Sequence, residues 1–161
     1  MKNLPSCPGF RAVKLLLLAL ILSLCLTGCG LPFRQKSGAT GVAASKTARD
    51  YLGAPYVYGG QTPKGFDCSG LTSYVYKKHG VKLPRSSVKQ AQAGRPVRKK
   101  NLKPGDLVFF KTGRSARVSH VGIYIGNDKF IHAPGTGKKV TTASLSSNYY
   151  KRTYHSARRV V

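Results

Sequence analysis

The residues from Val118 to Pro134 constrain the fold most tightly, because apolar side chains alternate on both sides of a turn sequence. Gly126, Asn127 and Asp128 have the composition of a tight turn between strands. A three-residue loop would pair Ile125 with Lys129 and place the apolar side chains of both halves on one face, where they can be buried together. A two-residue loop would instead place the apolar side chains of one strand on the same face as the histidine-bearing polar side chains of the other. The pattern predicts two antiparallel strands, 118–125 and 129–134. The apolar face then comprises Val121, Ile123, Ile125, Ile131 and Ala133.

The opposite face of this predicted hairpin carries two histidines. The same register pairs Gly122 with His132, so His120 and His132 become diagonal neighbours within about 7–8 Å. Gly122 is expected to leave open space between them. One histidine on a strand is usually a half-buried structural residue, but two on one face also suit a catalytic base and its partner. From these residues alone both interpretations stay open.

A cysteine stands where a glycine-containing loop, 65–70, becomes a helix. The helix is expected over 71–79, and Gly80 has the place of a glycine that ends a helix. A thiol in the first helical turn feels the partial positive charge of unpaired N–H groups, which favours the thiolate. Cys68 is therefore a candidate nucleophile, although a lone cysteine is more often a small apolar core residue.

The charge balance restricts the possible chemistry. The 161 residues include 28 Lys and Arg against only 4 Asp and no Glu, for a net charge of +24. So few carboxylates exclude a paired-carboxylate glycosidase site. The excess of positive charge indicates an anionic partner, but no DNA- or RNA-binding motif is present, so no nucleic acid is expected. Cys68, the single cysteine after residue 29, and four widely separated histidines do not form a usual set of zinc ligands. The acids are Asp50, Asp67, Asp106 and Asp128.

The first 28 residues are expected to be a targeting segment. Basic residues precede the apolar run 15–26, which is too short for a membrane span and suits a signal peptide. Leu26-Thr27-Gly28-Cys29 resembles the bacterial lipoprotein processing signal. The resemblance implies that Cys29 becomes the lipidated first residue of the mature protein and that the protein is held to a membrane through it. The absence of Asp after Cys29 implies the outer membrane, facing the periplasm.

This processing leaves one thiol in the mature domain. Cys7 and Cys25 would be removed with the leader, and Cys29 would be acylated, so Cys68 would have no disulfide partner. The leader also takes three basic residues, leaving 25 against 4 acids, or +21. A single free thiol in an exported domain indicates a reactive role.

The rest of the chain predicts an α+β domain over 44–161, after a lipidated tether over 29–43. A run of helical sequences comes first and the strands follow, which is typical of helices packed on an antiparallel sheet. The expected elements are a helix over 45–52, a brief helix capped by Ser86 and reaching Ala93, a buried strand over 107–110, and a last edge strand over 153–161.

Six short motifs follow one another along the domain: Tyr56-Val57-Tyr58-Gly59-Gly60, Phe66-Asp67-Cys68-Ser69-Gly70, Leu83-Pro84-Arg85, Lys103-Pro104-Gly105-Asp106-Leu107-Val108-Phe109-Phe110, Ser119-His120-Val121-Gly122-Ile123-Tyr124 and Phe130-Ile131-His132-Ala133. Their order and spacings are typical of the NlpC-type cell-wall cysteine peptidases, which the chain resembles from about Ser45 onward. The resemblance implies a minimal papain-like fold, monomeric and without a cofactor, that cleaves peptidoglycan stem peptides.

The resemblance also assigns roles to individual residues. Cys68 corresponds to the nucleophile of a cysteine endopeptidase that works through an acyl-enzyme, His120 to its base, and His132 to the third member that orients the base. Tyr56 resembles the tyrosine near the oxyanion. Asp67 and Ser69 resemble residues that hold polar groups of the substrate.

The sequence leaves the reaction itself open in two respects. The bond cleaved is either the D-γ-glutamyl–diaminopimelate bond within a stem or the D-alanyl–diaminopimelate cross-link. The alternative to an enzyme is an inactive cationic lipoprotein that binds peptidoglycan or other anionic envelope polymers.

Overall fold

A computed structural model describes residues 37–113 and 116–161, which lie in a compact unit, Gln35–Val161. The predicted leader, Cys29 and the first part of the predicted tether lie outside the described residues. Within the described ranges, no helix is both long and apolar enough to cross a membrane.

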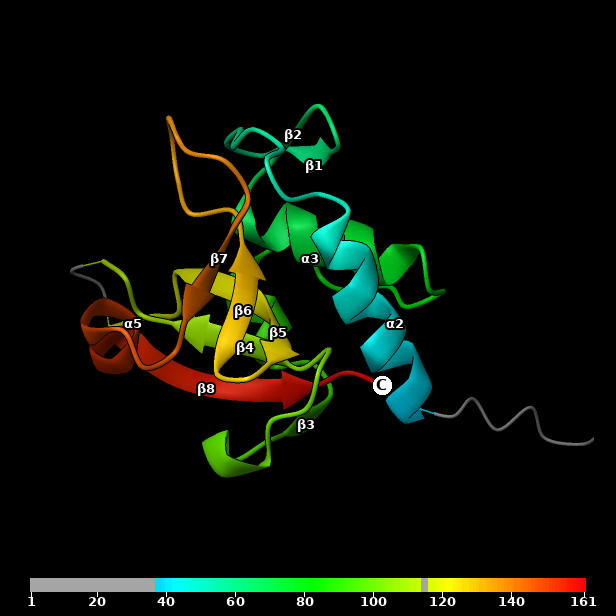
Figure 1. Ribbon diagram of the computed structural model, residues 1–161, viewed down its shortest axis with the longest axis vertical. Coiled ribbons are helices and arrows are strands. Elements are labelled where there is room, and N and C mark those ends of the chain that lie inside the picture. The colour runs from blue at the N-terminus through cyan, green and yellow to red at the C-terminus, as the bar shows by residue number, and fades with distance from the viewer. Residues whose placement is uncertain (1–36, 114–115) are drawn as a thin grey trace, which may run out of the picture. The chain divides into compact units, whose positions relative to one another are not determined.

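The centre of the fold is a six-stranded antiparallel sheet with the order β3-β8-β4-β5-β6-β7 (Figure 1). A second, two-stranded sheet pairs β1 with β2. The strands are β1 Gln61–Thr62, β2 Gly65–Phe66, β3 Arg95–Pro96, β4 Leu107–Phe110, β5 His120–Gly126, β6 Lys129–His132, β7 Thr141–Ser144 and β8 Tyr154–Arg159.

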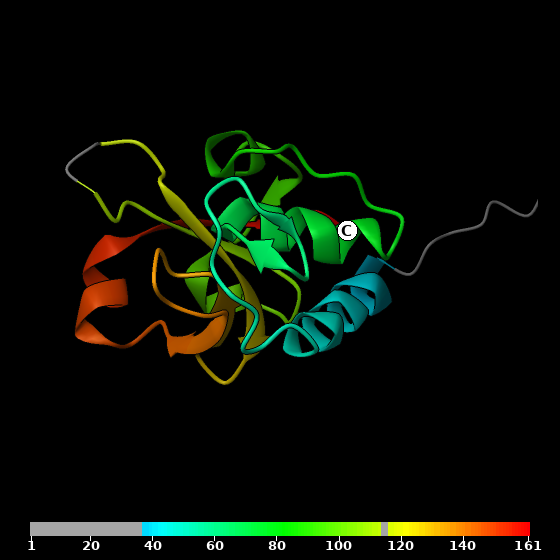
Figure 2. The same ribbon diagram turned by 90° about the horizontal axis from the view of Figure 1, so that it is seen from above.

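Helices cover the sheet from two sides (Figure 2). Helices α2 and α3 pack on the face formed by Val121, Ile123 and Ile131. The other face buries Phe110 and Phe130 beneath Tyr150 of α5. The fold is thus α+β, with early helices packed on an antiparallel sheet as predicted. The helical elements are α2 Ser37–Arg49, α3 Cys68–Lys77, α4 Ser87–Gln90, the 3-10 turn η1 Lys99–Asn101 and α5 Asn148–Thr153.

The predicted register of the central hairpin is confirmed, although its loop differs. Ile123 pairs with Ile131, which is the register that brings the apolar side chains to one face. At the tip, however, Gly126 pairs with Lys129, and a bulge before Gly126 restores the register. Asn127 and Asp128 alone form the turn, both with positive φ, as expected of a two-residue hairpin turn. Gly126, expected in the loop, therefore belongs to β5, and the bulge in that strand accommodates the additional residue.

Two predicted boundaries are wrong. Helix α2 begins at Ser37, so residues 37–43 of the predicted tether belong to the folded domain. Glycine has a low helix propensity, so Gly38 and Gly41 gave no sign of a helix in the sequence. In the structure Gly41 lies against the Pro104 carbonyl, where its lack of a side chain permits close packing. The last strand, β8, is not an edge strand, because the short strand β3 pairs with its outer side.

Candidate active site

The loop before α3 places Cys68 at the first position of that helix. Asp67 is the N-cap residue, and its Oδ1 accepts the Gly70 N–H at 2.6 Å. Gly70 allows the backbone at Gly60 to pass close to the first turn of α3, because a side chain at position 70 would collide with the Gly60 carbonyl oxygen. The thiol is therefore fixed by a cap and by a close backbone approach, and it carries no disulfide.

The pKa of Cys68 is raised, contrary to the expectation from its helix position. Burial of the thiol is the main cause, and the neighbouring Asp67 carboxylate adds to it. The N–H groups of Val121, Ser69 and Cys68 act in the expected direction and lower the pKa, but they do not outweigh burial. The resting site accordingly holds a neutral thiol beside the start of β5, and it needs a base to ionise it.

Strands β5 and β6 bring the two histidines together. His120 Nε2 lies 2.8 Å from His132 Nδ1, and both side chains are buried. Burial lowers the pKa of His120 to about 4 and, together with the nearby His120 and Lys138, that of His132 to about 3. Both imidazoles are thus neutral at pH 7, so one donates to the other. Among the described hydrogen bonds, Nδ1 of His120 is left uncommitted.

Aromatic side chains enclose His132. The ring of Phe130 lies 5.0 Å from that of His132, centroid to centroid, and fills the space beside Gly122 that was expected to be open. Tyr150 of α5 stands edge-on to His132, with its hydroxyl 3.4 Å from each ring nitrogen. Sequence reasoning missed Tyr150, because α5 itself was not predicted.

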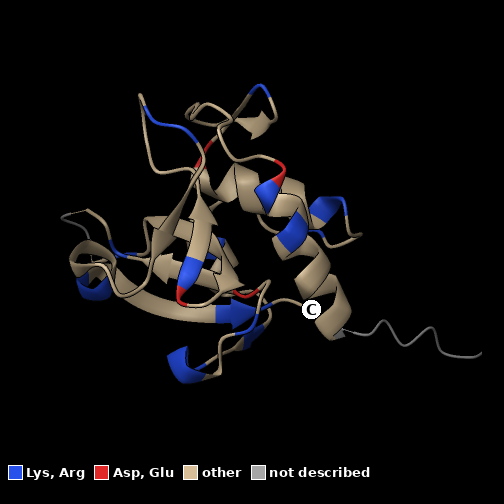
Figure 3. Ribbon diagram, in the orientation of Figure 1, with Lys and Arg blue, Asp and Glu red and all other residues tan. Residues whose placement is uncertain are grey.

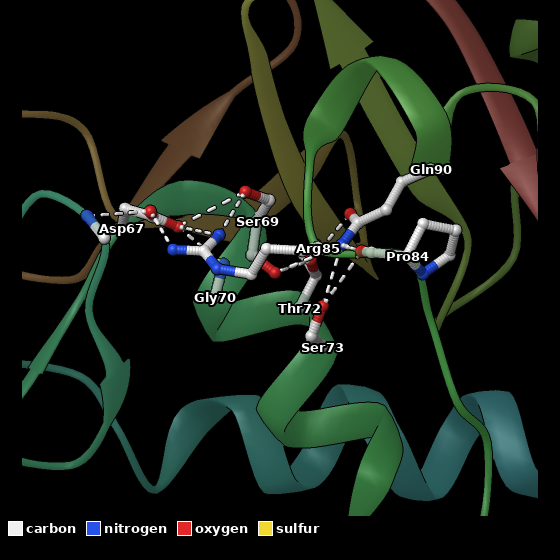
Figure 4. Close-up of polar contacts among 9 residues, drawn as sticks. Asp67, Ser69, Gly70, Thr72, Ser73, Pro84, Arg85 and Gln90 are labelled. Atoms are coloured by element: carbon white, nitrogen blue, oxygen red, sulfur yellow. Dashed lines mark hydrogen bonds and ion pairs between the residues drawn. The ribbon is translucent and has the colours of Figure 1, made fainter.

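A charged cluster, drawn in Figure 4, lines the same pocket as Cys68. Arg85 forms a bidentate pair with Asp67, with Nη1 to Oδ1 at 3.0 Å and Nη2 to Oδ2 at 2.5 Å, and it also donates to Ser69 Oγ at 3.0 Å. Burial raises the pKa of Asp67, but the hydrogen bonds from Arg85, Gly70 and Ser69 outweigh it and hold the pKa below its usual value. Arg85 was recognised only as part of a motif; its pairing needed the tertiary structure.

These groups share one pocket of about 410 Å³. Its lining includes Tyr56, Asp67, Cys68, Ser69, Arg85 and Ser119. The pKa of Tyr56 is raised by burial and then by the nearby Cys68 and Asp67. Four of the six predicted site residues of the domain, Tyr56, Asp67, Cys68 and Ser69, line this pocket. His120 follows Ser119, which also lines it, and is hydrogen-bonded to His132.

The described residues contain no group of three or more His, Cys, Asp or Glu side chains able to hold a metal ion. The site itself contains a thiol and, on β5, a histidine that can serve as its base. Positive charge is distributed over many elements of the domain, as expected from the sequence, whereas acidic positions are few (Figure 3).

The comparisons with known proteins agree with this geometry. The chain is similar to the murein DD-endopeptidase MepH of Escherichia coli K12, with 43% identity over 127 residues covering 76% of this chain and 46% of that protein. It is also 44% identical over 113 residues to the E. coli K12 murein DD-endopeptidase MepS/murein LD-carboxypeptidase, which covers 70% of this chain and 58% of that protein. The chain thus spans about half the length of these curated relatives.

A solved structure shows the same fold. An NlpC/P60 family protein from Bacillus cereus ATCC 10987 superposes with a TM-score of 0.70 at 38% identity, covering 74% of this chain and 40% of that one. The NlpC/P60 family model itself matches residues 53–159, which include the cysteine, both histidines and the Arg85 pair. On this match and the relatives' identity, the chain belongs to the NlpC/P60 family.

Proposed function

We propose that this protein is a cysteine endopeptidase that hydrolyses an amide bond in peptidoglycan stem peptides. One observation carries the proposal: a free thiol at a helix start contacts the backbone N–H of Val121 on β5, the residue after His120, and His120 is hydrogen-bonded to His132. The murein endopeptidases among its relatives are consistent with this substrate.

The histidine geometry defines how the nucleophile would be activated. His120 uses Nε2 for His132, so Nδ1 is the atom left to take the proton of Cys68. Protonated His120 then donates from Nε2 to His132 Nδ1, so the single N–H proton of neutral His132 must be on its Nε2. Tyr150 Oη is the hydroxyl within 3.4 Å of that nitrogen. His132 therefore orients the base and stabilises its charge, as the third member of a triad does.

The reaction would follow the usual two stages. The Cys68 sulfur attacks the amide carbon, and the developing oxyanion lies on the side of the Tyr56 hydroxyl. His120 returns its proton to the departing amine, which leaves an acyl-enzyme. A water molecule then gives a proton to His120 and attacks the thioester, and the acid product departs as the thiol is restored.

The lowered pKa of His120 affects this role in two ways. A pKa of about 4 keeps His120 unprotonated across the physiological range, so that it can accept the thiol proton, but it also makes His120 a weaker base than an imidazole with a pKa of about 7. The cluster of Arg85, Asp67 and Ser69 would bind the substrate. Its charged and hydroxyl groups are complementary to the free carboxylates and amines of stem peptides. The excess of positive charge would attract such an anionic polymer in a salt-dependent manner.

The experiment uses purified protein and muropeptides of defined structure. Mass spectrometry of the products identifies the bond cleaved, either D-γ-glutamyl–diaminopimelate or the D-alanyl–diaminopimelate cross-link. Cys68→Ala serves as the control. Product formation that persists in Cys68→Ala would exclude Cys68 as the nucleophile. No product from any muropeptide, together with binding to peptidoglycan, would replace the proposal by the binding-only alternative.

We also propose that the protein is a lipoprotein of the cell envelope. The support is the sequence Leu26-Thr27-Gly28-Cys29 and the short distance along the chain from Cys29 to the start of α2 at Ser37. Acylation of Cys29 would hold the domain at the outer membrane, facing the wall. Fractionation of cells with a label on the lipid tests this, and a protein free of lipid would exclude it.

A further inference from the structure

Gln90, the last residue of α4, is completely buried although its side chain is a primary amide. Its Nε2 lies 2.8 Å from the Pro84 carbonyl oxygen, 2.9 Å from Ser73 Oγ and 3.1 Å from the Ser69 carbonyl oxygen. Thr72 Oγ1 donates to its Oε1 at 2.8 Å. Burial of an amide is tolerated only where its hydrogen bonds are made, and both polar atoms of Gln90 are bonded here.

The orientation of this amide follows from its neighbours. The carbonyl oxygens of Pro84 and Ser69 can only accept, so the NH₂ group must face them. The reverse orientation would place an oxygen against two oxygens. Gln90 therefore links these two carbonyls in one specific arrangement, which an apolar side chain of the same size does not reproduce.

The two linked carbonyls belong to the two segments that form the charged cluster (Figure 4). Pro84 directly precedes Arg85, and Ser69 directly follows Cys68 on α3. The Arg85 side chain then bonds back to Asp67 and Ser69. The same loop and helix are joined twice, once by the Arg85 guanidinium at the pocket and once by the Gln90 amide beneath it.

The loop 81–86 depends on Gln90 for its position more than helix α3 does. Helix α3 is held by its own backbone hydrogen bonds and by the Asp67 cap. The segment 81–86 has no regular structure, and the described bonds to the Pro84 carbonyl come only from Gln90 and, at 3.2 Å, from Ser73. Gln90 therefore fixes the loop on the helix, and with it the backbone from which Arg85 extends.

We propose that Gln90 is a positioning residue that holds Arg85 in the pocket and thereby sets the affinity for the charged part of the stem peptide. This rests on the proposed function. Gln90 does not line the pocket, and it makes no hydrogen bond to Cys68, His120 or His132 among those described. Its effect is therefore on substrate binding through Arg85 and not on the chemical step.

The test compares Gln90→Met with Gln92→Met. Methionine keeps the length of the side chain but donates no hydrogen bond, and Gln92 is an exposed glutamine nearby in the chain. On the muropeptide that the wild type cleaves, Gln90→Met is expected to raise KM about tenfold with kcat within about twofold, because one hydrogen-bonded anchor is lost. Gln92→Met is expected to match the wild type. Alkylation of Cys68 by iodoacetamide, which needs no Arg85, should proceed at the wild-type rate in both variants.

A double-mutant cycle separates positioning from general support of the fold. In an Arg85→Ala background, Gln90→Met should change KM by less than about twofold, since the group it positions is gone. The milder Ser73→Ala, which removes the other bond to Pro84, should shift KM in the same direction by a smaller factor. Effects that are additive in the cycle, or a fall in kcat and alkylation with KM unchanged, would overturn the inference. A wild-type protein without turnover would instead remove the proposed function on which it rests.

Discussion

Adding one methyl group at Gly122 should inactivate the protein without touching any residue of the pocket. Gly122 lies on β5 between His120 and the bulge, opposite Val108 of β4. A Cβ atom there would stand 2.5 Å from Phe130 Cδ2 and 2.9 Å from the Ile131 carbonyl oxygen. Ordinary contact begins at 3.4 Å, so the Phe130 ring would have to retreat by about 0.9 Å and the Ile131 carbonyl by about 0.5 Å.

The displacement would reach His132, the next residue on β6. Phe130 is packed between Phe110 and Tyr150, at centroid distances of 4.9 and 4.8 Å, so its ring has little room to turn aside and the strand must move. A shift of about 0.5–0.9 Å would lengthen the 2.8 Å contact between the two histidines to about 3.3–3.7 Å, which weakens or breaks their hydrogen bond. We expect overpacking to cost about 1–3 kcal/mol in the free energy of unfolding. The misplaced base should lower kcat/KM about 100-fold.

Thermal unfolding and muropeptide cleavage of Gly122→Ala measure the two effects. Gly38→Ala in α2 is the matched control, because nothing lies within 4 Å of its Cβ and alanine favours a helix, so stability should be unchanged or slightly higher. Adding Phe130→Leu to Gly122→Ala should relieve the ring contact and restore part of the activity. A Gly122→Ala protein with wild-type stability and turnover would refute the reasoning, and it would mean that the histidine pair tolerates movement of β6.

Four further predictions concern the site and the anchor. Cys68→Ser should fold with a near-wild-type melting temperature, because serine suits a helix start, while product formation in the muropeptide assay falls by orders of magnitude; a destabilised but active variant would make Cys68 a core residue. His120→Ala should abolish muropeptide cleavage, whereas His132→Asn should retain a measurable fraction of the wild-type activity because an amide oxygen can still accept from His120. Equal losses of activity in the two variants would contradict the assigned roles. The pKa values of about 4 and 3 for these histidines, against 6.5 unperturbed, mean that the unfolded chain binds protons that the folded chain does not. Denaturant unfolding should therefore show stability falling as the pH drops from about 6.5 toward 4, and less steeply in His132→Asn; a flat profile would argue against buried neutral histidines. Cys29→Ser should move the protein from the membrane fraction to the soluble periplasm or block its processing, and unchanged fractionation would exclude the lipid anchor.

The sequence by itself determined those features that depend on neighbours along the chain. The alternation around the turn at 126–128 sufficed for the register that joins His120 to His132, because a shift by one residue would expose the whole apolar face. The helix start at Cys68 and the cap at Ser86 follow from local backbone chemistry in the same way. The local rule for the thiol was nevertheless insufficient, since burial raises the pKa that the helix start lowers.

Only the tertiary structure decided the contacts between residues distant in the chain. The pairing of Arg85 with Asp67, the burial of Gln90 beneath it and the approach of Tyr150 to His132 leave no periodic signal, because each partner belongs to a separate element. Helix α2 shows the same limit: its glycines oppose helix formation locally, and packing of its buried alanines against the domain stabilises it. Local patterns place Cys68 and the two histidines, whereas the pocket beside Cys68 depends on long-range packing, which local sequence rules do not specify.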